Sequence, residues 1–181
     1  PFRMSEHNDV LRLITYTGSQ SGSISSPAHL YTLAEDGSGD ALSIIGELPN
    51  SNQPAPLGKP GEQIYASRFI GDKGYLVTFR TIDPLYILDL SDPANPFIAS
   101  ELEIDGYSDY LHPVGENYLL GIGKDAIPDT RSGPRTGDGR GAWYQGVKLS
   151  LIDISNPNDP FEKEKIIIGK RGTETAVSRS H

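Results

Sequence analysis

Short apolar segments alternate with turn-forming residues along most of the chain. In the middle of the sequence, such segments occupy residues 64–70, 75–79, 85–90 and 97–104. The stretches between them are rich in Gly, Asp, Asn and Pro, which favour turn conformations. No segment keeps the 3.6-residue periodicity of an amphipathic helix. The pattern therefore predicts an all-β protein built from short strands.

An internal repeat sets the architecture that we expect. Residues 85–97 (LYILDLSDPANPF) match residues 149–161 (LSLIDISNPNDPF) at an offset of 64, which pairs Asp89 with Asp153 and Pro93 with Pro157. Upstream, residues 71–77 (GDKGYLV) resemble residues 115–120 (GENYLL), and the first glycines of the two segments, Gly71 and Gly115, are 44 positions apart. An insertion at residues 125–146 explains the difference between the two offsets. Without it, the period of about 44 residues is close to the length of a four-stranded propeller blade.

The repeat divides the chain into units. We expect a blade at residues 1–50, a linker at 51–61, a blade at 62–105, a blade at 106–170 with its long loop at 125–146, and one strand of a further blade at 173–181. The outer units have expected strands at 2–5, 10–16, 29–33 and 42–48, and at 109–114, 118–123, 147–154 and 161–168. The prediction is thus a partial β-propeller of about three four-stranded blades. A β-sandwich also has short strands and regular turns, but the fixed spacing favours the propeller.

The third strand of each clear repeat is apolar on both faces. Residues 85–88 (LYIL) and 149–152 (LSLI) show this pattern, which is typical of a strand covered on both sides. Ile87 and Ile152 are therefore expected to be fully buried. Asp89 and Asp153, each followed by Ser, are expected to accept hydrogen bonds in Asx-type turns.

Composition narrows the classes of function. The chain has a net charge of −8 and 36% hydrophobic residues, with no cysteine. An acidic surface repels nucleic-acid phosphates, so we expect no nucleic-acid partner. The lack of cysteine excludes disulfides and thiol catalysis. No run of 18 apolar residues exists, so no membrane span is expected.

Five segments together resemble a known family. They are residues 75–80 (YLVTFR), 83–93 (DPLYILDLSDP), 106–113 (GYSDYLHP), 121–125 (GIGKD) and 149–155 (LSLIDIS). This stretch, from Ile64 to Gly172, is similar to the β-propeller domain of secreted bacterial and archaeal proteins, distantly related to WD40 repeats. The resemblance implies a secreted or cell-envelope location and more blades than this chain holds. It implies no known reaction. The Gly-His and Trp-Asp signatures of true WD40 repeats are absent, so WD40 partner rules do not carry over.

Residues 109–112 (DYLH) lie on an expected first strand, which lines the channel of a propeller. Asp109 and His112, with Tyr110 between them, have the chemistry of a metal ligand set or an acid–base pair. The other interpretation is a hydrogen-bonded structural pair beside a turn. The four histidines show no HxH or HExxH spacing, so a zinc site has weak support. We expect no metal site, no cofactor and no catalytic residue.

The inserted loop is the main functional candidate. Residues 125–146 contain Arg131, Arg135, Arg140, Tyr144 and the only tryptophan, Trp143. Arg and Trp are enriched at binding hot spots, and long loops are either functional or merely mobile. The sequence leaves both interpretations of this loop open.

Two functional classes remain. The favoured one is a non-catalytic propeller module of an exported protein, which binds a protein or glycan through loops on one face. The alternative is a propeller enzyme of the hydrolase or lactonase kind, with a metal or acid–base site in the channel. Three blades and one strand do not close a ring, because propellers have four to eight blades. We therefore expect either a fragment of a longer polypeptide or self-association that completes the ring.

Overall fold

The computed structural model describes residues 3–16, 28–59, 62–79, 83–128 and 142–174, and its regular elements are all β-strands. The strands form three four-stranded antiparallel sheets, each with its strands in chain order. Blade 1 contains β1 (Met4–His7), β2 (Val10–Tyr16), β3 (Ala28–Glu35) and β4 (Leu42–Leu48). Blade 2 contains β5 (Gln63–Ile70), β6 (Lys73–Phe79), β7 (Asp83–Asp89) and β8 (Phe97–Ile104). Blade 3 contains β9 (Tyr107–Val114), β10 (Tyr118–Pro128), β11 (Ala142–Asp153) and β12 (Phe161–Ile168).

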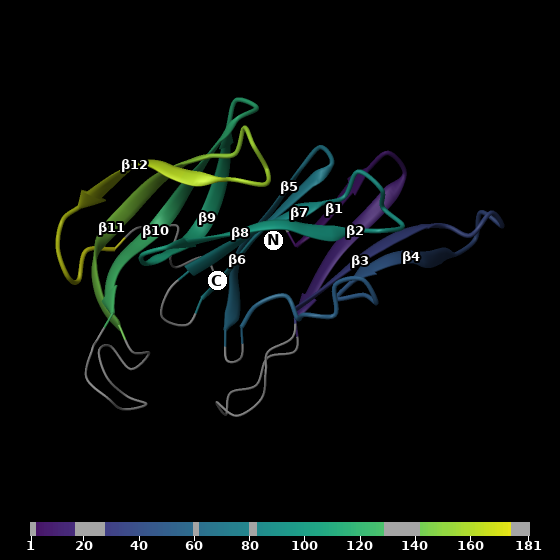
Figure 1. Cartoon of the computed structure of the whole chain (residues 1–181), viewed down its shortest axis with the longest axis horizontal. Helices are drawn as coiled ribbons and strands as arrows, with labels where there is room; N and C mark the ends of the chain where they lie inside the picture. Colours follow the sequence, from purple (N-terminus) through teal and green to yellow (C-terminus); the bar gives the residue numbers. More distant parts are fainter. Residues whose placement is uncertain (1–2, 17–27, 60–61, 80–82, 129–141, 175–181) are drawn as a thin grey trace.

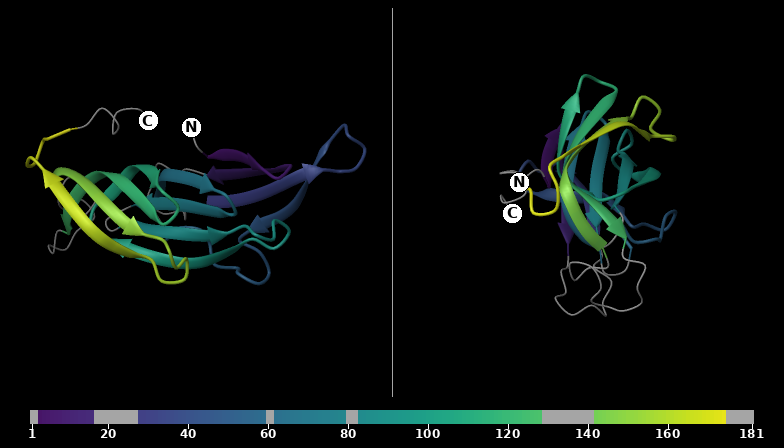
Figure 2. Two further views of the ribbon diagram at one scale, coloured as in Figure 1. Left: turned by 90° about the horizontal axis from the view of Figure 1, so that it is seen from above. Right: turned by 90° about the vertical axis from the view of Figure 1, so that its left-hand side faces the viewer.

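The three sheets stand side by side in chain order, with blade 2 in the middle (Figures 1 and 2). This arrangement confirms the predicted partial propeller. The first strand of blade 1 is displaced from the expected residues 2–5, since β1 spans Met4–His7. A two-residue turn, Asn8-Asp9, joins β1 to β2, and both residues have positive φ (53° and 63°). Such a turn matches the twist of a hairpin, which is why β1 extends to His7.

Two hydrophobic cores hold the blades together, one on each face of the middle sheet. The core between blades 1 and 2 is formed by Ile14, Ala28, Leu30, Leu48, Leu57, Ile64, Leu76, Tyr86, Leu88 and Leu90. The core between blades 2 and 3 is formed by Ala66, Tyr75, Val77, Leu85, Ile87, Leu111, Leu119, Ile152 and Ile154. Alternate residues of β6 and β7 serve the two cores, as strand geometry requires. Burial raises the pKa of the Tyr75 phenol to about 12.

The turns that follow the third strands repeat one polar motif. Oδ1 of Asp89 accepts hydrogen bonds from the backbone N–H (2.9 Å) and hydroxyl (2.6 Å) of Ser91. Asp153 and Ser155 form the same pair of bonds, at 3.0 and 2.6 Å. The predicted Asx turns are confirmed. Blade 1 has the motif too, because Asp36 accepts from Ser38.

The predicted linker packs against both blades that it joins. Leu57 is fully buried in the first core, and its carbonyl accepts from the N–H of Ala28 (3.4 Å). The Gln53 amide pairs with the backbone of Ile98, accepting from its N–H at 2.6 Å and donating to its carbonyl at 3.2 Å. Gln53 thus covers part of the open edge of β8, which reduces edge-to-edge pairing.

The inserted loop is shorter than the sequence predicted. We expected residues 125–146 to lack strand structure, but β10 extends to Pro128 and β11 begins at Ala142. A bulge between Lys124 and Ala126 lets the ladder continue, so Ala126 pairs with Tyr144. The Gly- and Asp-rich composition hid this extension, because a bulge breaks the alternating pattern. Residues 129–141, and residues 175–181 of the expected further strand, lie outside the described residues.

Equivalent positions in blades 2 and 3 should differ in how much side-chain truncation destabilises the protein. Ile87 is 0% exposed, whereas Leu151, its equivalent 64 positions later, is only partly buried. Ile87→Ala should lower the free energy of unfolding by about 2–5 kcal/mol. Leu151→Ala should cost about 1 kcal/mol, because no described sheet covers that side chain. Urea denaturation measures both, and equal losses would contradict the blade assignment.

The Asx turns should make stability depend on acid pH. Burial raises the pKa of Asp89, but hydrogen bonds from Lys73 and Ser91 outweigh it, so the net shift is downward. Stabilisation by Asp89 is therefore complete above about pH 4 and is lost as the pH falls through the lowered folded pKa. Asp89→Asn should cost about 1–2 kcal/mol at pH 7, because it removes charge-assisted hydrogen bonds.

The difference between wild type and Asp89→Asn should shrink as the pH falls below about 4, the ordinary pKa of an aspartate. Denaturation series at several pH values measure it, with Asp159→Asn as a control in an exposed turn. A difference that stays constant from neutral to strongly acid pH would mean that the charge of Asp89 contributes nothing.

Candidate functional site

The strand order gives the blades two different ends. At one end, tight turns join the first strand to the second and the third to the fourth; we call this the turn face. At the other end, which we call the loop face, the second strands end and the third strands begin. The ends of β6, β10 and β11 at the loop face point downward in Figure 1. The segments that join β2 to β3, β6 to β7 and β10 to β11 lie outside the described residues.

Four aromatic rings meet at the loop face where blades 2 and 3 adjoin. This aromatic cluster consists of Tyr65, Phe79, Tyr107 and Tyr144. The Phe79 ring is 1% exposed, and its centroid lies 5.3 Å from Tyr65, 4.8 Å from Tyr107 and 6.1 Å from Tyr144. The three tyrosines are partly exposed around it. Centroid distances of this size are those of favourable aromatic pairs, so the cluster is a fixed surface.

β-Bulges in the first strands of blades 2 and 3 position Tyr65 and Asp109. In blade 2, Ile64 pairs with Thr78 and Ala66 with Val77, so Tyr65 is an extra, bulged residue. The bulge in blade 3 lies between Tyr110 and Ser108, which makes Asp109 the extra residue there, 44 positions later. Bulges redirect side chains and cluster near functional sites. Tyr65 and Tyr107 come from the first strands of their blades, and their rings lie 4.9 Å apart.

The structure brings together only part of the Asp109–His112 candidate. Asp109 is buried, at 7% exposure, while His112 is exposed. The Tyr110 hydroxyl lies 3.1 Å from Nδ1 of His112, so these two share a hydrogen bond. Asp109 also has an interaction with a neighbour. Within the described ranges, no group of three or more His, Asp or Glu side chains is placed to hold a metal ion.

Two aromatic residues of the inserted loop lie in its described part, on opposite faces of β11. The Arg171 guanidinium lies over the Trp143 ring, 4.5 Å from its centroid. Tyr144 completes the aromatic cluster through an edge contact with Tyr107 at 5.5 Å. Arg131, Arg135 and Arg140 lie outside the described residues. Trp143 and Tyr144 were predicted from composition, whereas Tyr65, Phe79 and Tyr107 were missed because they look like ordinary strand residues.

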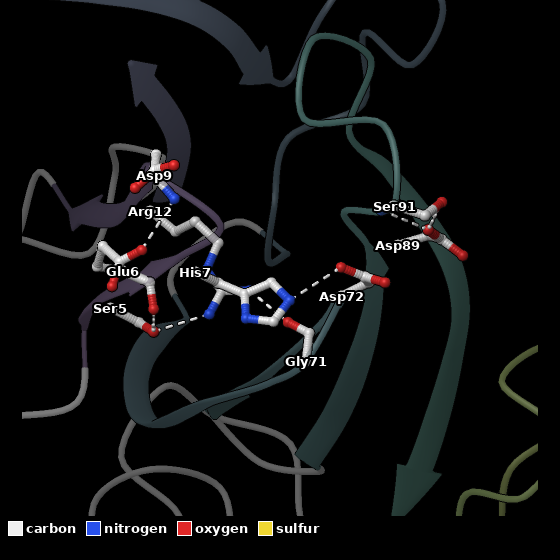
Figure 3. A network of polar contacts seen from close by, with 9 residues as sticks. All are labelled: Ser5, Glu6, His7, Asp9, Arg12, Gly71, Asp72, Asp89 and Ser91. Atoms are coloured by element: carbon white, nitrogen blue, oxygen red, sulfur yellow. Dashed lines mark hydrogen bonds and ion pairs between the residues drawn. The ribbon is translucent and has the colours of Figure 1, made fainter. Parts of the chain in front are cut away.

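A polar site lies at the turn face between blades 1 and 2 (Figure 3), and the sequence reasoning missed it as well. Arg12, only 4% exposed, donates to the carbonyl of Gly71 and to Oγ of Ser5 (2.8 Å). Its guanidinium lies 4.9 Å over the Phe69 ring. Burial lowers the pKa of Arg12, and the charge of Asp72 partly opposes this. A lone Arg in the apolar segment VLRLITY was the available signal.

The turn-face site is suited to joining blades rather than to holding a ligand. Nε2 of His7, in blade 1, lies 3.2 Å from Oδ1 of Asp72, in blade 2. A hollow of about 90 Å³ between them is lined by His7, Asn8, Val10, Arg12, Asp72, Leu90, Ser91 and Pro93. Ligand pockets are usually about 300 Å³ or larger. The contacts of Arg12 therefore connect the two blades, and the loop face is the better candidate for binding.

None of the described residues forms a helix that could cross a membrane.

The chain is similar to two archaeal proteins that have no described function. It is 38% identical over 164 residues to the uncharacterized protein MJ1554 of Methanocaldococcus jannaschii, a match that covers 91% of this chain and 22% of that protein. It is 36% identical over 180 residues to an uncharacterized protein of Archaeoglobus fulgidus, covering 99% of this chain and 23% of that protein.

The chain thus spans less than a quarter of the length of these relatives. A family model described as "Beta propeller domain" matches residues 1–181, which is the whole sequence. The three stacked four-stranded sheets agree with that match. The chain therefore belongs to the Beta propeller domain family.

Proposed function

We propose that this chain is a non-catalytic binding module of an exported protein, which contacts a protein or glycan partner through its loop face. The observation that supports this most is the aromatic cluster of Tyr65, Phe79, Tyr107 and Tyr144 where blades 2 and 3 meet. Its rings come from four strands of two blades, so the surface exists only when the blades are stacked. A surface of this kind is rigid before the partner arrives, which lowers the entropic cost of binding.

The residue types at this face favour a protein partner over a glycan. Trp, Tyr and Arg are the residues most enriched at protein-binding hot spots, and rigid aromatic groups supply large contact areas. Trp143 and Arg171 form a separate pair near the same end of blade 3, on the face of β11 opposite Tyr144. The arginines of the inserted loop, Arg131, Arg135 and Arg140, belong to the same segment of the chain.

The enzyme alternative has weaker support. It needs acidic or histidine side chains from several blades to converge on one point in the channel. Asp109 is buried at its bulge, and His112 is exposed and bonded to Tyr110. These two candidates therefore differ in solvent access, although they lie only three positions apart.

Substitutions at the loop face should reduce binding selectively. The purified chain would be tested against an array of glycans and against proteins exported by the source organism. Tyr65→Ala and Trp143→Ala should each weaken any specific complex about tenfold or more, as expected when an aromatic hot-spot residue is truncated. Affinities would be measured by biolayer interferometry, with folding checked by thermal unfolding.

Phe97→Ala is the matched control, because Phe97 is an exposed aromatic residue (42%) that begins a strand at the turn face. It should leave the affinity unchanged. An affinity that falls with Phe97→Ala but not with Tyr65→Ala or Trp143→Ala would refute binding at the loop face. Hydrolysis of a glycan on the array, lost in Asp109→Asn, would instead support the enzyme alternative.

A further inference from the structure

The hairpin formed by β3 and β4 is longer than its equivalents in the other blades. In blade 1, Leu33 pairs with Ile44 beside a bulge. Leu88 and Ile98 form the equivalent pair in blade 2. Blades 2 and 3 have one further pair before the turn, whereas blade 1 has two, the second of them formed by Leu42. The tip of this hairpin projects from the end of the molecule that lies far from blade 3 (Figures 1 and 2).

A side chain caps the backbone at the equivalent edge of blade 2. The Gln53 amide bonds to both the N–H (2.6 Å) and the carbonyl (3.2 Å) of Ile98, so these two groups point away from β7. Ile44 has the same place beside its bulge, so its N–H and carbonyl point away from β3. Those of Leu42, two residues away on the same strand, point outward as well. Among the described residues, no side chain bonds to the backbone of Leu42 or Ile44.

The edge of a blade stays accessible when a neighbouring blade covers its face. Ile98 packs against the core between blades 1 and 2, and Gln53 nevertheless reaches its backbone. The outward groups of Leu42 and Ile44 belong to the edge in the same way. What binds there is therefore a separate matter from what packs on the face of blade 1.

The side chains of β4 lack the charges that protect an open edge. Residues 41–45 are all exposed, and they include Leu42 (53%), Ile44 (59%) and Ile45 (36%). Ile45 is the extra residue at the bulge of this strand. The extra residue of β12 is Lys163, and lysine is a residue that discourages pairing at an edge. The strand β4 therefore has the features of one that accepts a partner.

The charges around this edge are all negative. Residues 13–58 contain no Lys or Arg. They contain four carboxylate side chains, which are exposed and form no ion pair with another described residue: Glu35, Asp36, Asp40 and Glu47. Asp40 lies just before the open part of β4 and Glu47 lies just after it. Basic groups of a partner would be attracted at both ends of the strand, with no cation nearby to oppose them.

We propose that β4 binds an extended segment of a partner protein, which adds to blade 1 as a further strand and has basic residues at both ends of a short apolar core. Backbone hydrogen bonds to Leu42 and Ile44 align the segment, as in other cases of strand addition. Its apolar side chains lie beside those of β4, and its basic residues lie near Asp40 and Glu47. The site is distinct from the loop face, so this inference does not rest on the proposed function.

A second copy of β4 fits this edge poorly. Antiparallel pairing of two copies would place Asp40 of one copy near Glu47 of the other. Like charges on opposed strands are destabilising. The occupant is therefore a segment of opposite charge.

Synthetic peptides test the edge directly. The probe peptide has lysine at both ends of a Val-Thr-Val-Thr-Val core, and N-methylation of alternate amides along one edge prevents it from pairing with itself. It should bind the purified chain about tenfold more tightly than the same peptide with glutamate at both ends, because only lysine is attracted to the carboxylates. A lysine peptide methylated along both edges should bind about tenfold more weakly, because it has lost its backbone donors. Fluorescence polarisation at low ionic strength measures the affinities.

Variants of the chain locate the binding. Asp40→Lys combined with Glu47→Lys should reverse the preference, so that the glutamate peptide binds better than the lysine peptide. Asp9→Lys combined with Asp159→Lys is the matched control, because it changes the net charge equally at exposed residues outside the hairpin and should leave the preference as it is. Ile44→Pro removes an N–H that β3 does not use, so it should weaken binding about tenfold while the chain stays folded. Circular dichroism verifies folding.

Hydrogen exchange provides a readout that does not depend on a substitution. The amides of Leu42 and Ile44 should exchange more slowly when the lysine peptide is bound, because they then donate to its backbone. Unchanged exchange at both amides, equal affinity for the lysine and glutamate peptides, undiminished binding of the doubly methylated peptide, or equal effects of the two double charge reversals would overturn the proposal. Tyr65→Ala and Trp143→Ala should not alter the peptide affinity, which separates this test from that of the loop face.

Discussion

A four-stranded sheet that is apolar on both faces is stable only when both faces are covered, and this constraint governs the molecule. Blade 2 satisfies it, because its central strands send alternate side chains into two separate cores. Neither neighbour does so alone, since each has one face against blade 2 and one that no described sheet covers. The stability of a blade therefore resides largely in its interfaces, as in other repeat architectures. Loss of one interface residue, such as Ile87, affects two sheets at once.

Apolar burial fixes the stacking, but polar contacts fix the register between blades. Non-directional burial tolerates small sliding motions of one sheet on another. The hydrogen bonds from Thr32 to Pro93 and from Ser100 to Pro157 are directional, and each joins a strand to the turn of the next blade. Arg12 adds a third such contact, because its guanidinium reaches the Gly71 carbonyl of blade 2.

The repeat predicted most of the fold, because it reports the period and the strands with two covered faces. It also predicted the Asx turns at Asp89 and Asp153. The same motif at Asp36 was missed, since the flanking sequence of blade 1 lacks the prolines that made the other turns recognisable. The strand extensions to Pro128 and from Ala142 were missed because local composition outweighed a ladder that continues past a bulge. Contacts between distant strands, such as that of Tyr65 with Tyr107, depend on three-dimensional packing and leave little trace in sequence.

The two ends of the blades differ in their contacts. The turn face contains turns that contact the preceding blade, whereas the loop face contains the connections that can vary. At the turn face, Asp89 and Asp153 hold the turns whose carbonyls meet the preceding blade, so a substitution there disturbs an interface. At the loop face the strands are paired up to their ends, so the hydrogen-bonded ladder of each sheet does not need the connecting segments. Blade 3 accommodates its insertion there, between Pro128 and Ala142, with no change in strand order. Segments that can vary without loss of the fold are where binding surfaces arise. The aromatic cluster lies at that same end, so the partner recognition proposed there does not involve the turn hydrogen bonds from Thr32 and Ser100 at the other end.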